Sequence, residues 1–168
     1  MVTAKTQYNL KNAQEYFEEH LCVGDYYAEG QRVSGEWQGI AAARLGLAGV
    51  VRADDFLRLC ENQHPVTGET LTQRVNTTRS QGGETAANRR IFFDFTFSPP
   101  KSVSLAGFLG EDVRILEAHA RAVKSALREF EAFASTRIRT GGAQNDRRTG
   151  NFAAALFTPN LPDTVVAV

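Results

Sequence analysis

The sequence predicts an α+β domain, because apolar segments with the period of a strand and of a helix alternate along the chain. In residues 91–97 aromatic side chains alternate with others, so Asp94 lies on the face opposite Phe93 and Phe95. Residues 111–137 carry an apolar stripe with spacings of three and four, which predicts a long amphipathic helix. Its members are Val113, Leu116, Ala120, Val123, Leu127, Phe130 and Ala134. Residues 152–157 form a second apolar strand.

The other elements follow in chain order. Leu10, Ala13, Phe17 and Leu21 predict a first amphipathic helix, and residues 37–45 and 52–60 predict two short ones. Residues 62–88 are polar and Gly-rich, which indicates a long connection with a short hairpin at 67–68. A helix ending at Leu109 follows the aromatic strand, and the glycines at 141–142 are expected to end the long helix.

Composition indicates one domain spanning residues 1–168, with 42% apolar and 23% charged residues. The net charge is zero, so DNA contacts would have to come from local patches. Two cysteines, Cys22 and Cys60, lack metal-ligand spacing and suit reduced thiols. The N-terminus is polar and no apolar run is long enough to span a bilayer, so we expect a cytoplasmic protein without a membrane partner.

The junction after the aromatic strand has two interpretations. Ser98 is a natural N-cap and Pro99 suits a first helical turn, so the segment reads as a core strand that enters a capped helix. Alternatively, the free amides of that helix end, with Lys101 beside them, would favour an anion such as phosphate.

Residues 94–104 read DFTFSPPKSVS, and six further blocks accompany this motif in a fixed order. These blocks are residues 25–28, 35–39, 45–49, 65–71, 118–123 and 149–151. In this pattern, over roughly residues 8 to 157, the chain resembles the MobF-type conjugative relaxases (the TrwC/TraI group). The resemblance implies an antiparallel sheet covered by helices, like that of HUH endonucleases, and incomplete at the C-terminus.

The same resemblance implies site- and strand-specific nicking of DNA at a plasmid transfer origin. A tyrosine hydroxyl attacks a phosphodiester and leaves a 5′-phosphotyrosine, and a tyrosine pKa near 10 suits a reversible transfer. Tyr16, in the pair Tyr16-Phe17, corresponds to the principal nucleophile, and Tyr26, in the pair Tyr26-Tyr27, corresponds to the second. The spacing between these two pairs is two residues longer than in the family. Asp94 corresponds to the carboxylate beside the metal. Without the resemblance, Tyr16 reads as a boundary core aromatic and Asp94 as a partner of an arginine.

The metal ligands are where the chain departs from the family pattern. Complete members bind a divalent metal, Mg or Mn, through three histidines, two of them in a His-x-His pair. The histidines here are His20, His64 and His119, and none corresponds to a ligand position. We therefore expect no metal in this chain as it stands. The chain is either a truncated relaxase or a diverged domain that binds DNA without nicking it.

Two arginine clusters are candidate DNA contacts, and each could equally be a solvated face. One brackets the polar connection at residues 62–88, and the other flanks the glycines at 141–142. Trp37 is a possible stacking platform for bases. The residues expected to bind DNA are Arg74, Arg79, Lys101, Arg147 and Arg148. The partner implied by the resemblance is single-stranded DNA at a transfer origin, together with the conjugation machinery. The alternative is a catalytically silent single-stranded-DNA-binding module.

Overall fold

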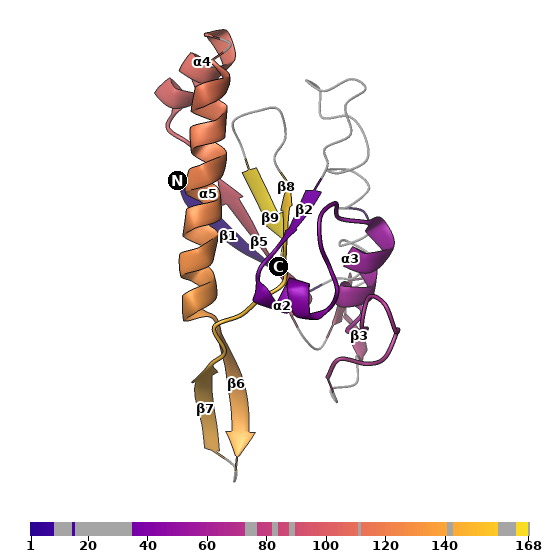
Figure 1. Ribbon diagram of the computed structural model, residues 1–168. Coiled ribbons are helices and arrows are strands. Elements are labelled where there is room, and N and C mark those ends of the chain that lie inside the picture. The colour runs from indigo at the N-terminus through magenta and orange to yellow at the C-terminus, as the bar shows by residue number, and fades with distance from the viewer. Residues whose placement is uncertain are drawn as a thin grey trace.

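The computed structural model contains a five-stranded sheet in the order β1-β5-β9-β8-β2, in which all neighbours are antiparallel. The strands are β1 (Val2–Gln7), β5 (Phe92–Phe97), β9 (Thr164–Ala167), β8 (Ala154–Phe157) and β2 (Gly35–Gln38). Figure 1 shows helices on both sides of this sheet. The predicted α+β class with an antiparallel sheet is confirmed.

The structure describes residues 1–8, 15, 35–72, 77–81, 84–87, 90–110, 112–140, 143–157 and 164–167. The helix predicted from Leu10 to Leu21 lies outside these residues, apart from Glu15. Tyr16, Tyr26 and Arg74 also lie outside them.

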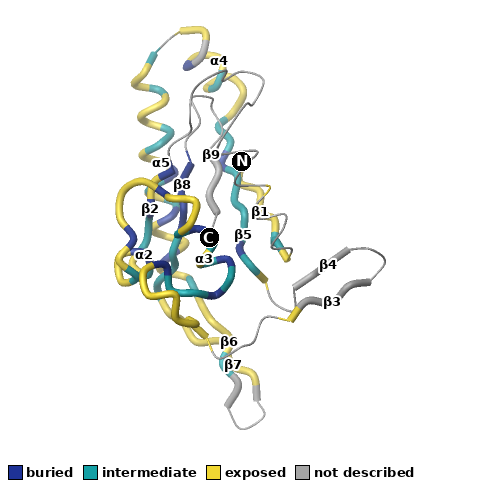
Figure 2. The backbone as a smooth tube through the Cα atoms, turned by 90° about the vertical axis from the view of Figure 1, so that its right-hand side faces the viewer, coloured by how far each residue is buried: buried dark blue, intermediate teal, exposed yellow. Residues whose placement is uncertain are grey.

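One face of the sheet is covered by α5 (Val113–Phe133). Asp112 caps the start of α5, where its side chain accepts the backbone N–H of Arg114 at 3.0 Å. The middle of the predicted stripe is buried, with Val123 and Leu127 packed against Phe97 and the α5-facing side chains of β8. The ends of the helix are exposed (Figure 2). The long helix predicted from periodicity is therefore present, but only the centre of its stripe is buried, while Val113, Leu116 and Phe130 are exposed.

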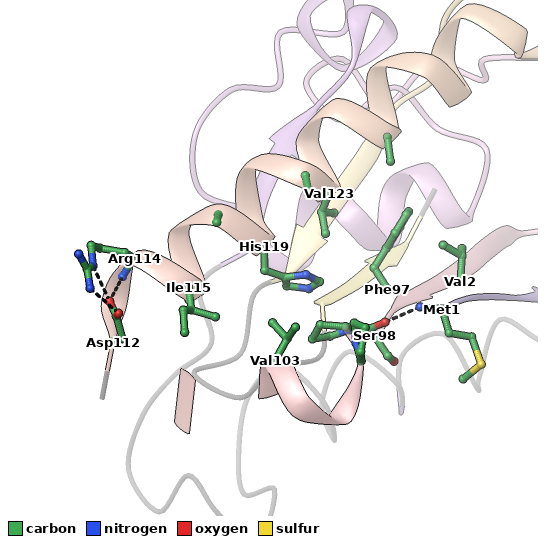
Figure 3. Close-up of a pocket in the computed structure, with 15 residues that line it drawn as sticks. Met1, Val2, Phe97, Ser98, Val103, Asp112, Arg114, Ile115, His119 and Val123 are labelled. Atoms are coloured by element: carbon green, nitrogen blue, oxygen red, sulfur yellow. Dashed lines mark hydrogen bonds and ion pairs between the residues drawn. The ribbon is translucent and has the colours of Figure 1, made fainter. Parts of the chain in front are cut away.

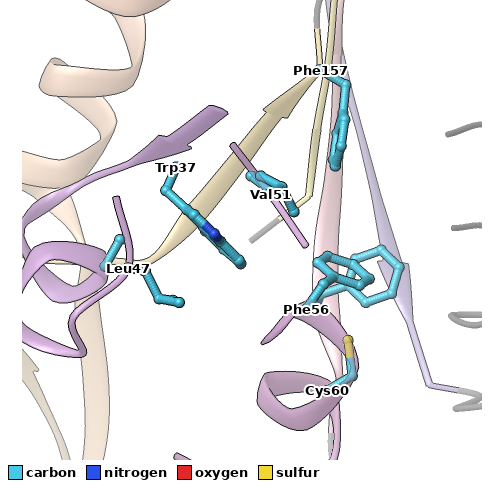
Figure 4. Close-up of a cluster of buried hydrophobic side chains, with 9 residues drawn as sticks. Trp37, Leu47, Val51, Phe56, Cys60 and Phe157 are labelled. Carbon is cyan, nitrogen blue, oxygen red and sulfur yellow. The ribbon is translucent and has the colours of Figure 1, made fainter. Parts of the chain in front are cut away.

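The opposite face is covered by α2 (Ile40–Arg44) and α3 (Ala53–Cys60). A second apolar cluster fills the space beneath them (Figure 4). Its buried members are Trp37, Ala42, Leu47, Val51, Phe56, Cys60, Phe92, Ala155 and Phe157. Gly35 is required here because a Cβ at this position would lie 2.2 Å from the ring of Phe157.

Two predicted helix boundaries are wrong. Trp37 lies on β2 opposite Ala155, and α2 begins only after Gly39, whose φ of 99° breaks the strand. The long helix ends at Phe133, and the chain continues directly into β6 (Ser135–Thr140). β6 pairs with β7 (Ala143–Arg148), and its alternating β-branched residues favour a strand. The glycines at 141–142 therefore stand between two strands and do not end the helix.

The described parts of the connection over residues 62–88 contain two hairpins, where the sequence predicted one. The hairpin at 67–68 is confirmed, since Gln63 and Thr70 form a bridge and Gly68 has a φ of 74°. A second hairpin follows, made of β3 (Thr78–Gln81) and β4 (Glu84–Ala87).

The helix after the aromatic strand is α4 (Lys101–Leu109), and its N-cap residue is Pro100. Ser98 does not cap it, because α4 begins two residues later than predicted and no side chain accepts a hydrogen bond at its N-cap. The backbone N–H of Ser98 donates a hydrogen bond to the carbonyl of Met1 at 2.9 Å. None of the described helices is both long and apolar enough to cross a membrane.

Candidate nucleic-acid interface

Asp94 lies in the middle of β5, half-buried, with a strand paired on each side. Phe95 and Phe97 of the same strand pack toward α5. Since side chains alternate along a strand, Asp94 lies on the face opposite α5, as predicted. The strand therefore separates a carboxylate from the aromatic side chains next to it in sequence.

Lys5 of β1 is paired directly with Asp94 across the two strands, so both side chains belong to the same face. Sequence reasoning missed Lys5, because the register that joins residues 5 and 94 is set by the pairing of strands far apart in the chain. An ammonium group beside Asp94 gives this face a positive as well as a negative group.

Lys101 is the first residue of α4 and is exposed. The first turn of α4 has no side-chain cap, and the Met1 ammonium group donates a hydrogen bond to the carbonyl of Ser98 just before it. An anion at this helix end stays a prediction.

A cavity of about 690 Å³ lies between α4, α5 and the end of β5, and most of its lining is apolar. Figure 3 shows His119 among the side chains that line it, close to Phe97 and Val103. Because α5 covers the face opposite Asp94, His119 is separated from Asp94 by the sheet.

The two described histidines, His64 and His119, lie on different segments and do not form one site. The Nδ1 atom of His64 accepts the backbone N–H groups of Val66 and Thr67 at 3.2 and 3.3 Å, which organises the hairpin at 67–68. In the part of the chain that the structure describes, no group of three His, Cys, Asp or Glu residues could hold a metal ion. The described residues thus do not fit a histidine triad.

The β6–β7 hairpin projects beyond the end of α5 (Figure 1) and carries the second arginine cluster. Arg148 is paired with Ser135 and Arg147 with Thr136, so the two arginines lie on opposite faces of the hairpin. Arg137 shares the face of Arg148 and forms an exposed ion pair with Asp146 at 3.3 Å. The structure therefore separates two arginines that the sequence places side by side.

The guanidinium of Arg148 lies 4.7 Å from the centre of the Phe133 ring. This cation–π contact orients a charge that is otherwise exposed. Arg79, of the first cluster, lies on β3. Arg90 lies just before β5, with its guanidinium 5.2 Å from the centre of the Phe93 ring.

The interpretation of Trp37 as a stacking platform is wrong. The side chain is only 7% exposed and belongs to the apolar cluster beneath α2 and α3. An indole in this position contributes to folding and cannot stack on a nucleobase.

A family model described as TrwC relaxase matches residues 10–160 of this chain. The chain belongs to the TrwC relaxase family. Among its relatives is the multifunctional conjugation protein TraI of Escherichia coli (strain K12), which is 39% identical over 133 residues. That alignment covers 79% of this chain and 7% of TraI.

Solved structures of TrwC have the same fold. The metal-bound structure of the conjugative relaxase TrwC in complex with oriT DNA has a TM-score of 0.70 and 30% identity. The match covers 99% of this chain and 55% of the TrwC chain. TrwC complexed with a 27-mer DNA comprising the recognition hairpin and the cleavage site gives a TM-score of 0.69 at 26% identity. This member of the TrwC relaxase family therefore spans about half of the TrwC chains and a small part of TraI.

Proposed function

We propose that this chain is part of a conjugative relaxase domain and binds single-stranded DNA at a plasmid transfer origin. The observation that carries the proposal is the similarity to TrwC structures bound to oriT DNA, which extends over nearly the whole chain. Asp94 supports it, because the resemblance implies a carboxylate beside the metal site and Asp94 is a half-buried carboxylate in the middle of β5. The conjugation machinery is the proposed partner, and the cytoplasm the proposed compartment.

The proposed chemistry is a transesterification in which Tyr16 is the nucleophile. Its phenolic oxygen bonds to the scissile phosphorus, the bond from phosphorus to the 3′ oxygen breaks, and the released 3′ oxygen takes a proton. Asp94 would help to accept the tyrosine proton or, where the metal is bound, orient a histidine ligand, and either role requires the carboxylate to be ionised or hydrogen-bonded. Tyr26 is the proposed second nucleophile.

We further propose that nicking is impaired in this chain as it stands, while DNA binding is retained. The family uses a divalent metal, Mg or Mn, to polarise the scissile phosphate. The support for impairment is that His64 organises a turn and His119 lies across the sheet from Asp94. Binding depends instead on exposed cationic side chains, of which Lys101, Arg147 and Arg148 are described.

A denaturing gel tests the catalytic part of this proposal. The chain is incubated with a labelled single-stranded origin oligonucleotide and Mg²⁺ or Mn²⁺, and covalent adducts are separated from bound DNA. We expect no adduct, although the oligonucleotide is retarded in a native gel. An adduct that disappears in Tyr16→Phe would contradict the impairment and would establish Tyr16 as the nucleophile.

A further inference from the structure

Five phenylalanines line a groove of about 610 Å³ on the α5 side of the sheet, where α5 meets the β6–β7 hairpin. They are Phe93, Phe95, Phe130, Phe133 and Phe152, and we call this the aromatic groove. Its rim carries small polar side chains, including Thr136, Thr149 and Asn151. The groove is separated by the sheet from the face that carries Asp94.

Three of the five rings contact one another in series, and none of the five is buried. Phe93 and Phe95 are 6.2 Å apart, and Phe95 and Phe130 are 5.7 Å apart, in both cases tilted. Phe130 is 39% exposed and Phe133 is 66% exposed. Large aromatic side chains exposed side by side on a surface typically mark a binding site.

Two cationic groups lie against rings that line the groove. Arg90 lies over Phe93 just before β5, and Arg148 lies over Phe133 at the end of β7. Both arginines are exposed. Among the described residues that line the groove, none is acidic. The groove is therefore apolar, and two exposed cationic groups lie against its rings.

We propose that the aromatic groove holds an unpaired base of single-stranded DNA, with the phosphates on either side of that base next to Arg90 and Arg148. This proposal rests on the proposed DNA binding and adds a second contact, away from the face where nicking chemistry is expected. Aromatic side chains stack bases of any sequence, and cationic side chains follow the backbone.

The test compares two oligonucleotides of the same length, one of thymidines and one in which the bases are replaced by a stable abasic analogue. Phe133→Ala removes an exposed ring, and circular dichroism checks that the fold is unchanged. Val113→Ala removes an exposed apolar side chain at the other end of α5 and is the matched control. For the thymidine strand we expect Phe133→Ala to weaken binding by about 5- to 100-fold, the usual effect of one lost base–aromatic stack.

Binding of the abasic strand should weaken clearly less than binding of the thymidine strand in Phe133→Ala, because the abasic strand loses no base stacking and Arg148 stays charged although the ring beside it is removed. Equal losses for both strands, or no loss for the thymidine strand, would contradict the groove proposal while leaving the DNA-binding function in place. Absence of binding of either strand to the unmodified chain would contradict both proposals. Sedimentation that shows a dimer converted to a monomer by Phe133→Ala, with DNA affinity unchanged, would instead assign the groove to a second copy of the chain.

Discussion

The Oε1 atom of Glu131 accepts the backbone N–H of Ile40 at 2.6 Å, which ties the C-terminal part of α5 to the first residue of α2. The same oxygen accepts the backbone N–H of Phe152 at 3.2 Å, just before β8. Glu131 is only 8% exposed. One carboxylate therefore connects α5, α2 and the chain that enters the sheet, and it satisfies two backbone donors that no helix or strand ladder would satisfy.

Glu131→Ala should destabilise the fold, because it leaves both donors without their acceptor. We expect a loss of about 2–4 kcal/mol in the free energy of unfolding, measured by urea denaturation. Glu131→Gln keeps an acceptor oxygen and should lose less. Glu129→Ala, on an exposed position of the same helix, is the control and should stay within about 0.5 kcal/mol. Equal effects of the substitutions at 131 and 129 would contradict the structural role.

Leu127→Ala tests the packing of α5 on the sheet. Leu127 is 3% exposed and contacts the cluster that contains Phe97 and Leu156, so the truncation leaves a cavity. The expected loss is about 2–5 kcal/mol in the same denaturation experiment. Arg128→Ala, one position along and exposed, should have little effect. A loss below about 1 kcal/mol for Leu127→Ala would mean that the helix does not pack as described.

Local periodicity was sufficient to predict the strand at 91–97 and the long helix. Both have apolar side chains repeated over several turns or alternations, so their buried faces can be recognised without knowledge of their neighbours. The same alternation also predicted that Asp94 and Phe95 lie on opposite faces of the strand. These elements form the centre of the sheet and its main covering helix.

The remaining features depend on contacts between distant parts of the chain. Trp37 reads as part of a helix in sequence, but pairing of β2 with β8 places it in a strand and in the core. Lys5 is next to Asp94 only through the register of β1 and β5. The carboxylate of Glu131 is buried because α2 and residue 152 bring donors to it. No property of residues 5, 37 or 131 alone indicates these environments.

The fluorescence of Trp37 distinguishes a core residue from a DNA-stacking residue. Trp37 is the only tryptophan of the chain, so the intrinsic emission reports on it alone. We expect emission at short wavelength, poor quenching by iodide, and no quenching when single-stranded DNA binds. Strong quenching on DNA addition, while circular dichroism is unchanged, would show that the indole is accessible to bases.

Arg147 and Arg148 provide a matched pair of substitutions, because they are adjacent in sequence and lie on opposite faces of the hairpin. We expect Arg148→Gln to weaken DNA binding more than Arg147→Gln, since Arg148 stands beside the aromatic groove. The loss should be similar for unrelated DNA sequences, as phosphate contacts position the strand without reading it. Anisotropy titrations at fixed salt measure both variants, and a larger effect of Arg147→Gln would place the DNA on the other face.

The salt dependence of binding to single-stranded origin DNA tests the proposed function most directly. Fluorescence anisotropy of a labelled oligonucleotide gives the dissociation constant at increasing salt, with the folded state checked in parallel. We expect the affinity to fall steeply between about 50 and 200 mM salt, because each neutralised phosphate releases condensed counterions. The slope of the logarithm of affinity against the logarithm of salt concentration should become shallower by about one unit in Arg148→Gln. A folded sample that does not bind DNA at low salt, or binds with no salt dependence, would contradict the account.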